Sequence, residues 1–289
     1  MEIISSAAAW RAALDAARGA GSRVGLVPTM GALHAGHASL VDAARADCGL
    51  VTASVFVNPL QFGDAADLAA YPRDLEADAE LLSAHGCDVL FAPSVAEMYP
   101  RHPAPSLTTV HVVGAAEGFE GSDRPGHFDG MATVVTLLFN LAGPCRAYFG
   151  EKDFQQLAVV RQMVLDLGQP VEVVGCPTAR AADGLALSSR NARLSPAGRA
   201  AAPVLHAALM AGAASAAAGA DGTTIEAAMA AQVATEPRAV LFYAAAVDPA
   251  SLTPVHRTAP GVDLRLLVAV EIDGVRLIDN LAATCGPAS

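Results

Sequence analysis

The chain has 289 residues, of which 53% are hydrophobic and 16% are charged. Its mean hydropathy of +0.39 excludes an intrinsically disordered chain. Eighteen basic residues against 29 acidic ones give a net charge of -11, so the chain has no general basic field that would hold nucleic acid.

The N-terminus, the cysteines and the longest apolar stretch indicate neither a signal peptide, nor a disulfide scaffold, nor a membrane span. Residues 1–19 contain Glu2 and no basic segment, which is typical of a strand followed by a helix rather than a signal peptide. The five cysteines are scattered and form no C-x-x-C pair, so they predict neither a zinc site nor a disulfide scaffold, and they fit a reducing compartment. Residues 200–220 are rich in alanine and include Pro203, so we expect a helix of a soluble fold there and not a membrane span.

Short apolar runs alternate with amphipathic segments through the first 180 residues. The predicted strands are 23–29, 49–57, 87–93, 145–150 and 171–178. The predicted helices lie near 36–47, 72–85, 129–142 and 153–167. Buried strands separated by helices are typical of parallel βαβ units, so the sequence predicts an α/β fold with a Rossmann-like, doubly wound parallel sheet.

The pattern changes after residue 195. Two alanine-rich segments, about 195–218 and 223–235, predict helices, and three apolar runs, 239–248, 263–272 and 275–280, predict strands. The last two runs are joined by Asp273-Gly274, which is a strong signal for a β-hairpin. We therefore expect a domain of residues 1–180 and a smaller α+β domain of residues 181–289.

The segment PTMGALHAGH, residues 28–37, lies where an open α/β sheet binds its ligand, between a strand and the following helix. Gly31 and Gly36 permit close approach of the backbone to a phosphate, and amides at a helix start favour an anion. His34 and His37 are three residues apart and can donate to the same phosphate chain. Zinc ligation and a structural role at the helix start stay open as alternatives. Neither a Walker loop nor a complete dinucleotide fingerprint is present.

Two further polar clusters follow predicted strands. Residues 150–156 include Lys152, the only lysine, whose flexible point charge suits a moving phosphate, although a solvated lysine at a helix start is an equal alternative. Ser188, Ser189 and Arg190 lie in a polar turn that could close over a polyphosphate or could simply cap the next helix.

Two loops are also rich in polar groups. Gln61 follows the second predicted strand of this series, so its carboxamide should lie beside the histidine-bearing segment. Residues 124–130, RPGHFDG, predict either a second contact with an anion or only a turn before the helix that starts near 129.

Five sequence blocks resemble the pantothenate synthetase family, which belongs to the nucleotidylyltransferase superfamily. They are PTMGALHAGH, FVNPLQF, RPGHFDG, FGEKDFQQL and DGLALSSRN, in this order. H-x-G-H alone is typical of the superfamily, whereas the five linked blocks are specific to the family. The resemblance implies ATP-dependent condensation of pantoate with β-alanine through a pantoyl adenylate. It also implies Mg²⁺ on the ATP phosphates, held mainly by ATP oxygens and water and by no assigned protein ligand.

The resemblance assigns roles to individual residues. His37 takes the proton-donor role, with His34 and Lys152 as further catalytic residues on the phosphates. Gln61 and Gln156 bind pantoate, and Gln61 also binds β-alanine. The implied ATP-binding residues are Met30, Gly31, Ala32, Leu33, His34, Ala35, Gly36, His37, Gly150, Glu151, Lys152, Asp153, Ala179, Leu187, Ser188, Ser189 and Arg190.

The resemblance further implies that residues 1–180 bind ATP and pantoate, that residues 181–289 form a lid, and that the protein is a cytoplasmic homodimer without nucleic-acid or membrane partners. Two other functions stay open. Nucleotidyl transfer to a phosphorylated acceptor would need extra Arg or Lys in the acceptor pocket, where this chain offers Gln61 and Gln156. A noncatalytic ATP-binding protein would not need His34, Lys152 and Arg190 together.

Overall fold

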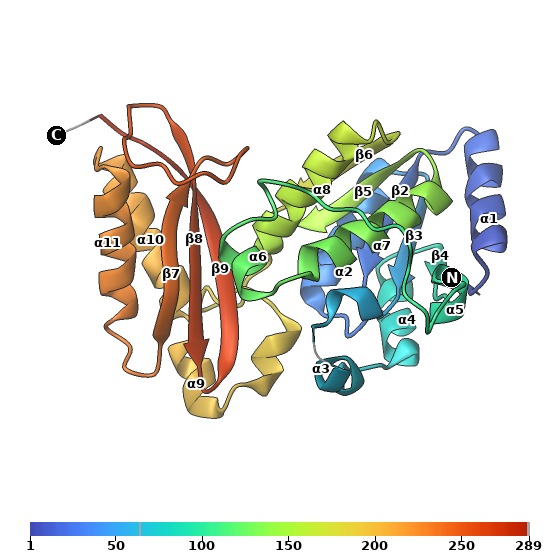
Figure 1. Cartoon of the computed structure of the whole chain (residues 1–289), viewed down its shortest axis with the longest axis horizontal. Coiled ribbons are helices and arrows are strands. Elements are labelled where there is room, and N and C mark those ends of the chain that lie inside the picture. The colour runs from blue at the N-terminus through green and yellow to red at the C-terminus, as the bar shows by residue number, and fades with distance from the viewer. Residues whose placement is uncertain (64, 288–289) are drawn as a thin grey trace. The chain divides into compact units, whose positions relative to one another are not determined.

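A computed structural model describes residues 1–63 and 65–287, and it forms two compact units (Figure 1). The first unit comprises Met1–Gly150 and Gln155–Pro177. The second comprises Glu151–Phe154 and the chain from Thr178 onward. The chain thus leaves the first unit for four residues and returns to it, and the domain division predicted between residues 180 and 181 stays a prediction.

Six parallel strands form the sheet of the first unit, in the order β1-β4-β3-β2-β5-β6. They are β1 (Glu2–Ile4), β2 (Val24–Thr29), β3 (Leu50–Val55), β4 (Val89–Phe91), β5 (Cys145–Gly150) and β6 (Val171–Cys176). The predicted doubly wound parallel sheet is confirmed. The direction of strand addition reverses between β2 and β5, so the carboxyl ends of these two strands flank the point where such sheets bind ligands.

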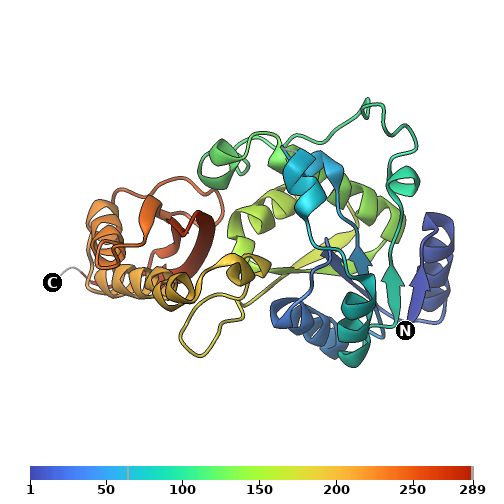
Figure 2. The same cartoon turned by 90° about the horizontal axis from the view of Figure 1, so that it is seen from below.

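Helices cover both faces of this sheet, with α2 and α4 on one face and α7 and α8 on the other (Figure 2). The helices are α1 (Ala7–Gly19), α2 (Ala35–Asp47), α3 (Ala65–Ala70), α4 (Leu75–Ala84), α5 (Val95–Met98), α6 (Phe119–Asp123), α7 (His127–Ala142) and α8 (Phe154–Asp166), with the 3-10 turn η1 (Pro59–Gln61). A second 3-10 turn, η2 (Glu151–Asp153), belongs to the second unit. The sequence did not predict α3, α5 and α6, because four to six residues are too few to show a helical period.

The single tryptophan anchors α1 to the sheet of the first unit. Trp10 is fully buried and stacks on Phe91, with 4.2 Å between ring centroids. Its indole Nε1–H donates to Thr52 Oγ1 over 2.9 Å, so the one polar atom of the ring is satisfied in the core.

The second unit is a three-stranded antiparallel sheet with helices on one face. Its elements are η3 (Ser189–Arg193), α9 (Pro196–Ala201), α10 (Val204–Ala217), α11 (Gly222–Val233), β7 (Val240–Val247), β8 (Asp263–Ile272) and β9 (Val275–Thr284). Leu205 and Leu209 of α10 and Met229 of α11 share a buried cluster with Leu266 and Val268 of β8. The predicted α+β architecture is confirmed.

Two details of the second unit bear on the sequence predictions. Asp273 and Gly274 both have positive φ, 53° and 73°, as a tight hairpin turn requires, so the predicted β8–β9 hairpin is confirmed. The single helix predicted at 195–218 is wrong, because the chain breaks between α9 and α10 at Pro203. Proline lacks the backbone N–H that a continuous helix needs.

Among the described residues, Pro196–Ala217 is the one stretch that is long and apolar enough to cross a membrane by length and composition. It contains both α9 and α10. Its buried side chains, such as Leu205 and Leu209, belong to the core cluster of the second unit. This packing is what a core helix of a globular unit shows.

Candidate active site

The two histidines of the 28–37 segment cap the start of α2 reciprocally. His34 is the N-cap residue, and its Nδ1 accepts from Gly36 N–H over 3.1 Å. His37 Nδ1 accepts from the backbone N–H of His34 over 3.3 Å. Because each Nδ1 accepts, each neutral ring carries its proton on Nε2. The rings lie 4.2 Å apart between centroids and are tilted by 50° to one another.

Most backbone amides of this segment have acceptors within the same unit. They are the N–H groups of Gly31, Ala32, Leu33, His34, Gly36 and His37. The motif predicted that the amides at the helix start would favour an anion. In the structure these amides are hydrogen-bonded inside the protein.

Gln61 is oriented by a buried asparagine. Asn58 Nδ2 donates to Gln61 Oε1 and to the carbonyl of Gly130, both over 3.0 Å, and Asn58 Oδ1 accepts from the Tyr99 hydroxyl over 2.8 Å. Burial raises the pKa of Tyr99, which keeps its hydroxyl a donor. Since Gln61 Oε1 is occupied, its Nε2 donors point the other way and lie 2.9 Å from Met30 Sδ. Gln61 therefore lies beside the histidine-bearing segment, as predicted.

The RPGHFDG block packs against the turn that carries Gln61. A Cβ at Gly130 would lie 2.2 Å from the carbonyl oxygen of Leu60, so only glycine permits this contact. His127 is buried, and its Nδ1 lies 2.9 Å from the Gln61 carbonyl oxygen while its Nε2 lies 3.0 Å from Arg124 Nη1. Because a guanidinium can only donate, Nε2 accepts and Nδ1–H donates. This block therefore supports the turn that carries Gln61. Helix α7 begins within the block, at His127.

The Lys152 segment is held by the β9 strand of the second unit. Asn280 Nδ2 donates to the carbonyl of Glu151 over 2.9 Å and to that of Lys152 over 2.7 Å. Asn280 Oδ1 accepts from Arg265 Nε over 2.7 Å, and Arg265 Nη2 also reaches Glu151 Oε2 at 3.1 Å. Lys152 Nζ lies 3.0 Å from Asp153 Oδ1, and the lysine side chain is 17% exposed. The lysine side chain thus lies against the Asp153 carboxylate with limited solvent contact.

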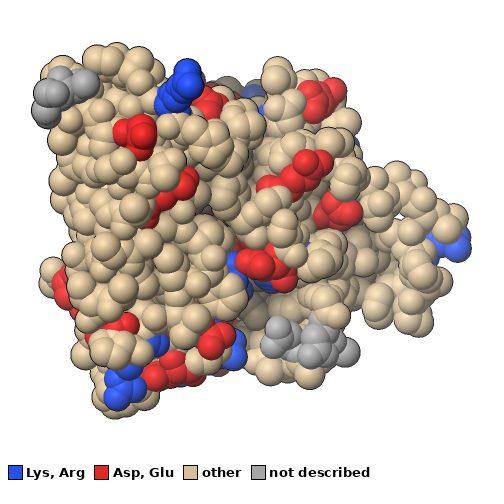
Figure 3. All heavy atoms as spheres, turned by 60° about the vertical axis from the view of Figure 1, so that its left-hand side comes forward, with Lys and Arg blue, Asp and Glu red and all other residues tan. Residues whose placement is uncertain are grey.

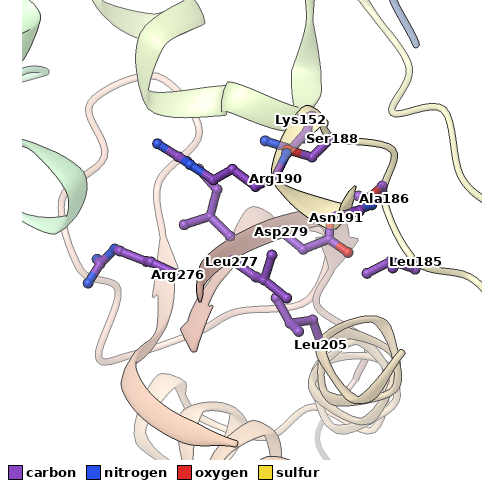
Figure 4. Close-up of a pocket in the computed structure, with 11 residues that line it drawn as sticks. Lys152, Leu185, Ala186, Ser188, Arg190, Asn191, Leu205, Arg276, Leu277 and Asp279 are labelled. Atoms are coloured by element: carbon purple, nitrogen blue, oxygen red, sulfur yellow. Dashed lines mark hydrogen bonds between the residues drawn. The ribbon is translucent and has the colours of Figure 1, made fainter. Parts of the chain in front are cut away.

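A pocket in the second unit brings Lys152 together with the predicted polar turn (Figure 4). Ser188 and Arg190 line it beside Lys152, as do Arg276 and Asp279 of β9. The wall is rigid on the β9 side, because Arg180 forms an ion pair with the carboxylate of Asp279, with 2.5 Å and 2.9 Å contacts. Lys152 and Arg190 thus line the same small pocket, of about 10 Å³, whereas the guanidinium of Arg276 lies over the Phe242 ring, 4.3 Å from its centroid.

The other predicted site residues lie close in the chain to the residues around Gln61 or to those around Lys152. Leu187 N–H donates to the carbonyl of Ala179 over 2.9 Å, so these two predicted ATP contacts are neighbours. Gly150 ends β5, and Gln156 is half-buried in the first turn of α8. Asn58 was not predicted, although it lies inside the FVNPLQF block. Asn280 was not predicted either, because nothing beyond its place in a strand distinguishes it in the sequence.

The structure also bears on the alternatives for the histidines and for charged ligands. Within residues 1–63 and 65–287, no group of three or more His, Cys, Asp or Glu side chains is placed to hold a metal ion. A zinc site at His34 and His37 therefore lacks further ligands in this part of the chain. The face shown in Figure 3 carries acidic and basic side chains scattered over an uncharged surface.

Comparisons with known proteins agree over nearly the whole chain. The family model described as pantoate-beta-alanine ligase matches residues 2–282. Pantothenate synthetase from Allorhizobium ampelinum is 50% identical over 287 residues, which are 98% of this chain and 97% of that protein.

Solved structures of pantothenate synthetases also match nearly the whole chain. The crystal structure of pantothenate synthetase from Thermus thermophilus matches with a TM-score of 0.88 and 51% identity, covering 97% of this chain and 99% of that one. Pantoate-beta-alanine ligase from Francisella tularensis, complexed with beta-gamma ATP and beta-alanine, matches with a TM-score of 0.77 and 32% identity, covering 97% of both chains.

Proposed function

This chain belongs to the pantoate-beta-alanine ligase family, and we propose that the side-chain groups around Gln61 and Lys152 carry out the family's ATP-dependent ligation through a pantoyl-adenylate intermediate. The observation that carries the proposal is the pair of oriented donors in the first unit. Gln61 turns its Nε2 donors toward Met30, and the capping bonds at the start of α2 engage Nδ1 of His34 and of His37, so each neutral ring carries its proton on Nε2.

In the first step, the pantoate carboxylate attacks the α-phosphorus of ATP, and the bond to the pyrophosphate leaving group breaks. A carboxylate is already ionised at pH 7, so this step needs no general base. It needs alignment of the two reactants and stabilisation of the charge that develops on the phosphates. We assign alignment of pantoate to Gln61 and Gln156, since amide donors suit a hydroxy-acid and carry no charge that would repel ATP.

Charge stabilisation on the phosphates falls to two sets of donors. His37 and His34 supply neutral N–H donors, and His37 takes the proton-donor role. Lys152 supplies a positive charge that can follow the leaving pyrophosphate, and Ser188 and Arg190 line the same pocket. Mg²⁺ would arrive with ATP as part of the substrate, coordinated by phosphate oxygens.

The remaining assignments to ATP rest on the family resemblance, together with their places in the chain. In the first unit they are Met30, Gly31, Ala32, Leu33, Ala35, Gly36 and Gly150. In the second they are Glu151, Asp153, Ala179, Leu187 and Ser189.

In the second step, the neutral amine of β-alanine attacks the adenylate carbonyl, the bond to AMP breaks, and the amine loses a proton as the amide forms. We propose that Gln61 also contacts β-alanine. The relative from Francisella tularensis was crystallised with beta-alanine and an ATP compound, which supports binding of both substrates by one fold. By analogy with the family we also propose a cytoplasmic homodimer, testable by light scattering on the purified protein.

The test separates the two half-reactions. Pyrophosphate release from MgATP is measured with pantoate alone, and AMP and the amide product are measured after β-alanine is added. Pantoate-dependent pyrophosphate followed by β-alanine-dependent AMP is the expected result. Pyrophosphate release that does not depend on pantoate but requires a phosphorylated acceptor would instead identify a nucleotidyltransferase. ATP binding without turnover would identify a noncatalytic protein.

A further inference from the structure

The loop that joins β2 to the paired histidines contains two consecutive residues in the left-handed region. Gly31 has φ +86° and Ala32 has φ +53°. Glycine adopts such angles readily, but alanine does so only where the surroundings hold it there. The turn therefore needs an anchor, and its shape determines how the chain enters α2.

That anchor is Asp78, which lies in the first half of α4. Its Oδ2 accepts from Ala32 N–H over 3.1 Å, and its Oδ1 accepts from Leu33 N–H over 2.8 Å. The residue is 4% exposed. A Cβ at Gly31 would lie 2.8 Å from Asp78 Oδ2, so the loop packs directly on the carboxylate and glycine is required above it. Both oxygens of one buried carboxylate are thus used by successive amides of the turn.

The anchored amides lie immediately before the histidine pair. Leu33 is followed by His34, the N-cap of α2, whose ring and backbone engage Gly36 and His37. A shift of the turn would therefore move both imidazoles, because their positions are fixed by the capping bonds and by the point at which the chain enters the helix.

We propose that Asp78 is a positioning residue for adenylate formation, which acts by locking the left-handed turn so that His34 and His37 meet the ATP phosphates. The proposal rests on the function proposed above for the two histidines. Asp78 contacts neither the reacting groups nor an imidazole in this scheme; it contacts the backbone that carries them. It also lines a cavity of about 440 Å³ in the first unit, so removal of its carboxylate would open the turn to water.

The carboxylate is needed as such, because both of its oxygens accept. In Asp78→Asn one oxygen becomes an NH₂ group, which would place a donor against a backbone donor and lose one of the two bonds. Asp74→Ala is the matched control. Asp74 caps the same helix through Ala77 N–H, so its loss weakens α4 without touching the turn.

The experiment has one arm that does not depend on turnover. Hydrogen exchange at the Ala32 and Leu33 amides is followed by NMR in the substrate-free protein. We expect slow exchange in the wild type and in Asp74→Ala. In Asp78→Asn we expect exchange at least ~10-fold faster, the factor that follows from losing a hydrogen bond to a charged group. Amides that exchange in the wild type like those of an open loop would overturn the proposal.

The second arm measures pantoate-dependent pyrophosphate release. Asp78→Asn should lower kcat by at least ~10-fold while the KM for pantoate stays within about threefold, since Gln61 is held by other elements. Asp74→Ala should keep the wild-type kcat even where it lowers the melting temperature. Equal kcat values in Asp78→Asn and wild type would also overturn the proposal. If Asp78→Asn does not fold, Asp78→Glu is measured in its place. Wild-type protein that is inactive but has protected Ala32 and Leu33 amides would refute the proposed function and leave the role of Asp78 as an anchor of the turn intact.

Discussion

Replacement of Asn280 by alanine is the most direct test of how the Lys152 segment is held. Asn280 is 4% exposed and bonds the carbonyls of Glu151 and Lys152 and the guanidinium of Arg265. Asn280→Ala leaves these three groups without their partner at a buried position. An unsatisfied buried group costs ~1–3 kcal/mol, and some of these groups will gain water, so we expect a loss of about 3 kcal/mol in the free energy of unfolding of the second unit.

The assay combines stability with activity. Urea unfolding followed by far-UV circular dichroism reports the whole chain, while the fluorescence of Trp10, buried in the first unit, reports that unit alone. Loss of stability should appear in the first signal more than in the second. Pantoate-dependent pyrophosphate release should fall at least ~10-fold at temperatures where the variant is folded, since a misplaced Lys152 forfeits ~1.4 kcal/mol or more of transition-state stabilisation.

A matched control lies on the same strand. Thr284→Ala removes one exposed hydrogen bond, from Thr284 Oγ1 to Asp263 over 2.8 Å, and should change stability by less than about 1 kcal/mol. Activity of Asn280→Ala within twofold of wild type would refute the reasoning that this side chain places the lysine. Stability within about 1 kcal/mol would refute the calculation of its buried contacts.

Four further predictions follow from single groups. Lys152→Ala should lower pyrophosphate release by about two orders of magnitude, and a loss of only a few-fold would contradict the phosphate role. Tyr99→Phe removes the donor to Asn58 and should raise the KM for pantoate ~5-fold, measured in the same assay. Burial raises the pKa of the Cys87 and Cys145 thiols to about 11 and about 12, so mass spectrometry should find both unmodified by iodoacetamide at pH 8 in native protein and modified in denaturant. The hydrogen bond from the Thr224 amide lowers the pKa of Asp221, the N-cap of α11, so this carboxylate stabilises the fold at pH values above its ordinary pKa of 3.8. Asp221→Ala should therefore lower the melting temperature at pH 7. The difference in melting temperature between the variant and the wild type should shrink as the pH falls below 3.8.

Local sequence patterns were sufficient to predict the sheet of the first unit and the hairpin of the second. Buried strands such as β2 and β5 are short apolar runs bounded by polar turns, and Asp273-Gly274 supplies two residues that tolerate positive φ. Pro203 was visible in the sequence and should have divided the helix predicted there. The short helices α3 and α5 left no periodic signal and were found only in the structure.

Residues 151–154 make contacts with distant parts of the chain that no local sequence pattern indicates. The sequence places them directly after β5, and the predicted first domain therefore included them. In the structure they group with the second unit, because Asn280 and Arg265 bind Glu151 and Lys152 across a separation of more than a hundred residues. No window along the chain contains both partners, so neither spacing nor composition could have indicated this contact.

The same logic explains why motif reasoning found the groups expected to touch substrate and missed those that hold them. His34, His37 and Lys152 lie in recognisable blocks. Their supports are buried polar side chains that bond backbone atoms of those blocks, Asp78 from 45 and 46 residues away and Asn280 from 128 and 129 residues away. Backbone atoms are the same in every residue, so such a contact leaves no mark on the sequence of the segment that it holds. Substitution at either support should therefore reduce turnover without removing any group that contacts ATP.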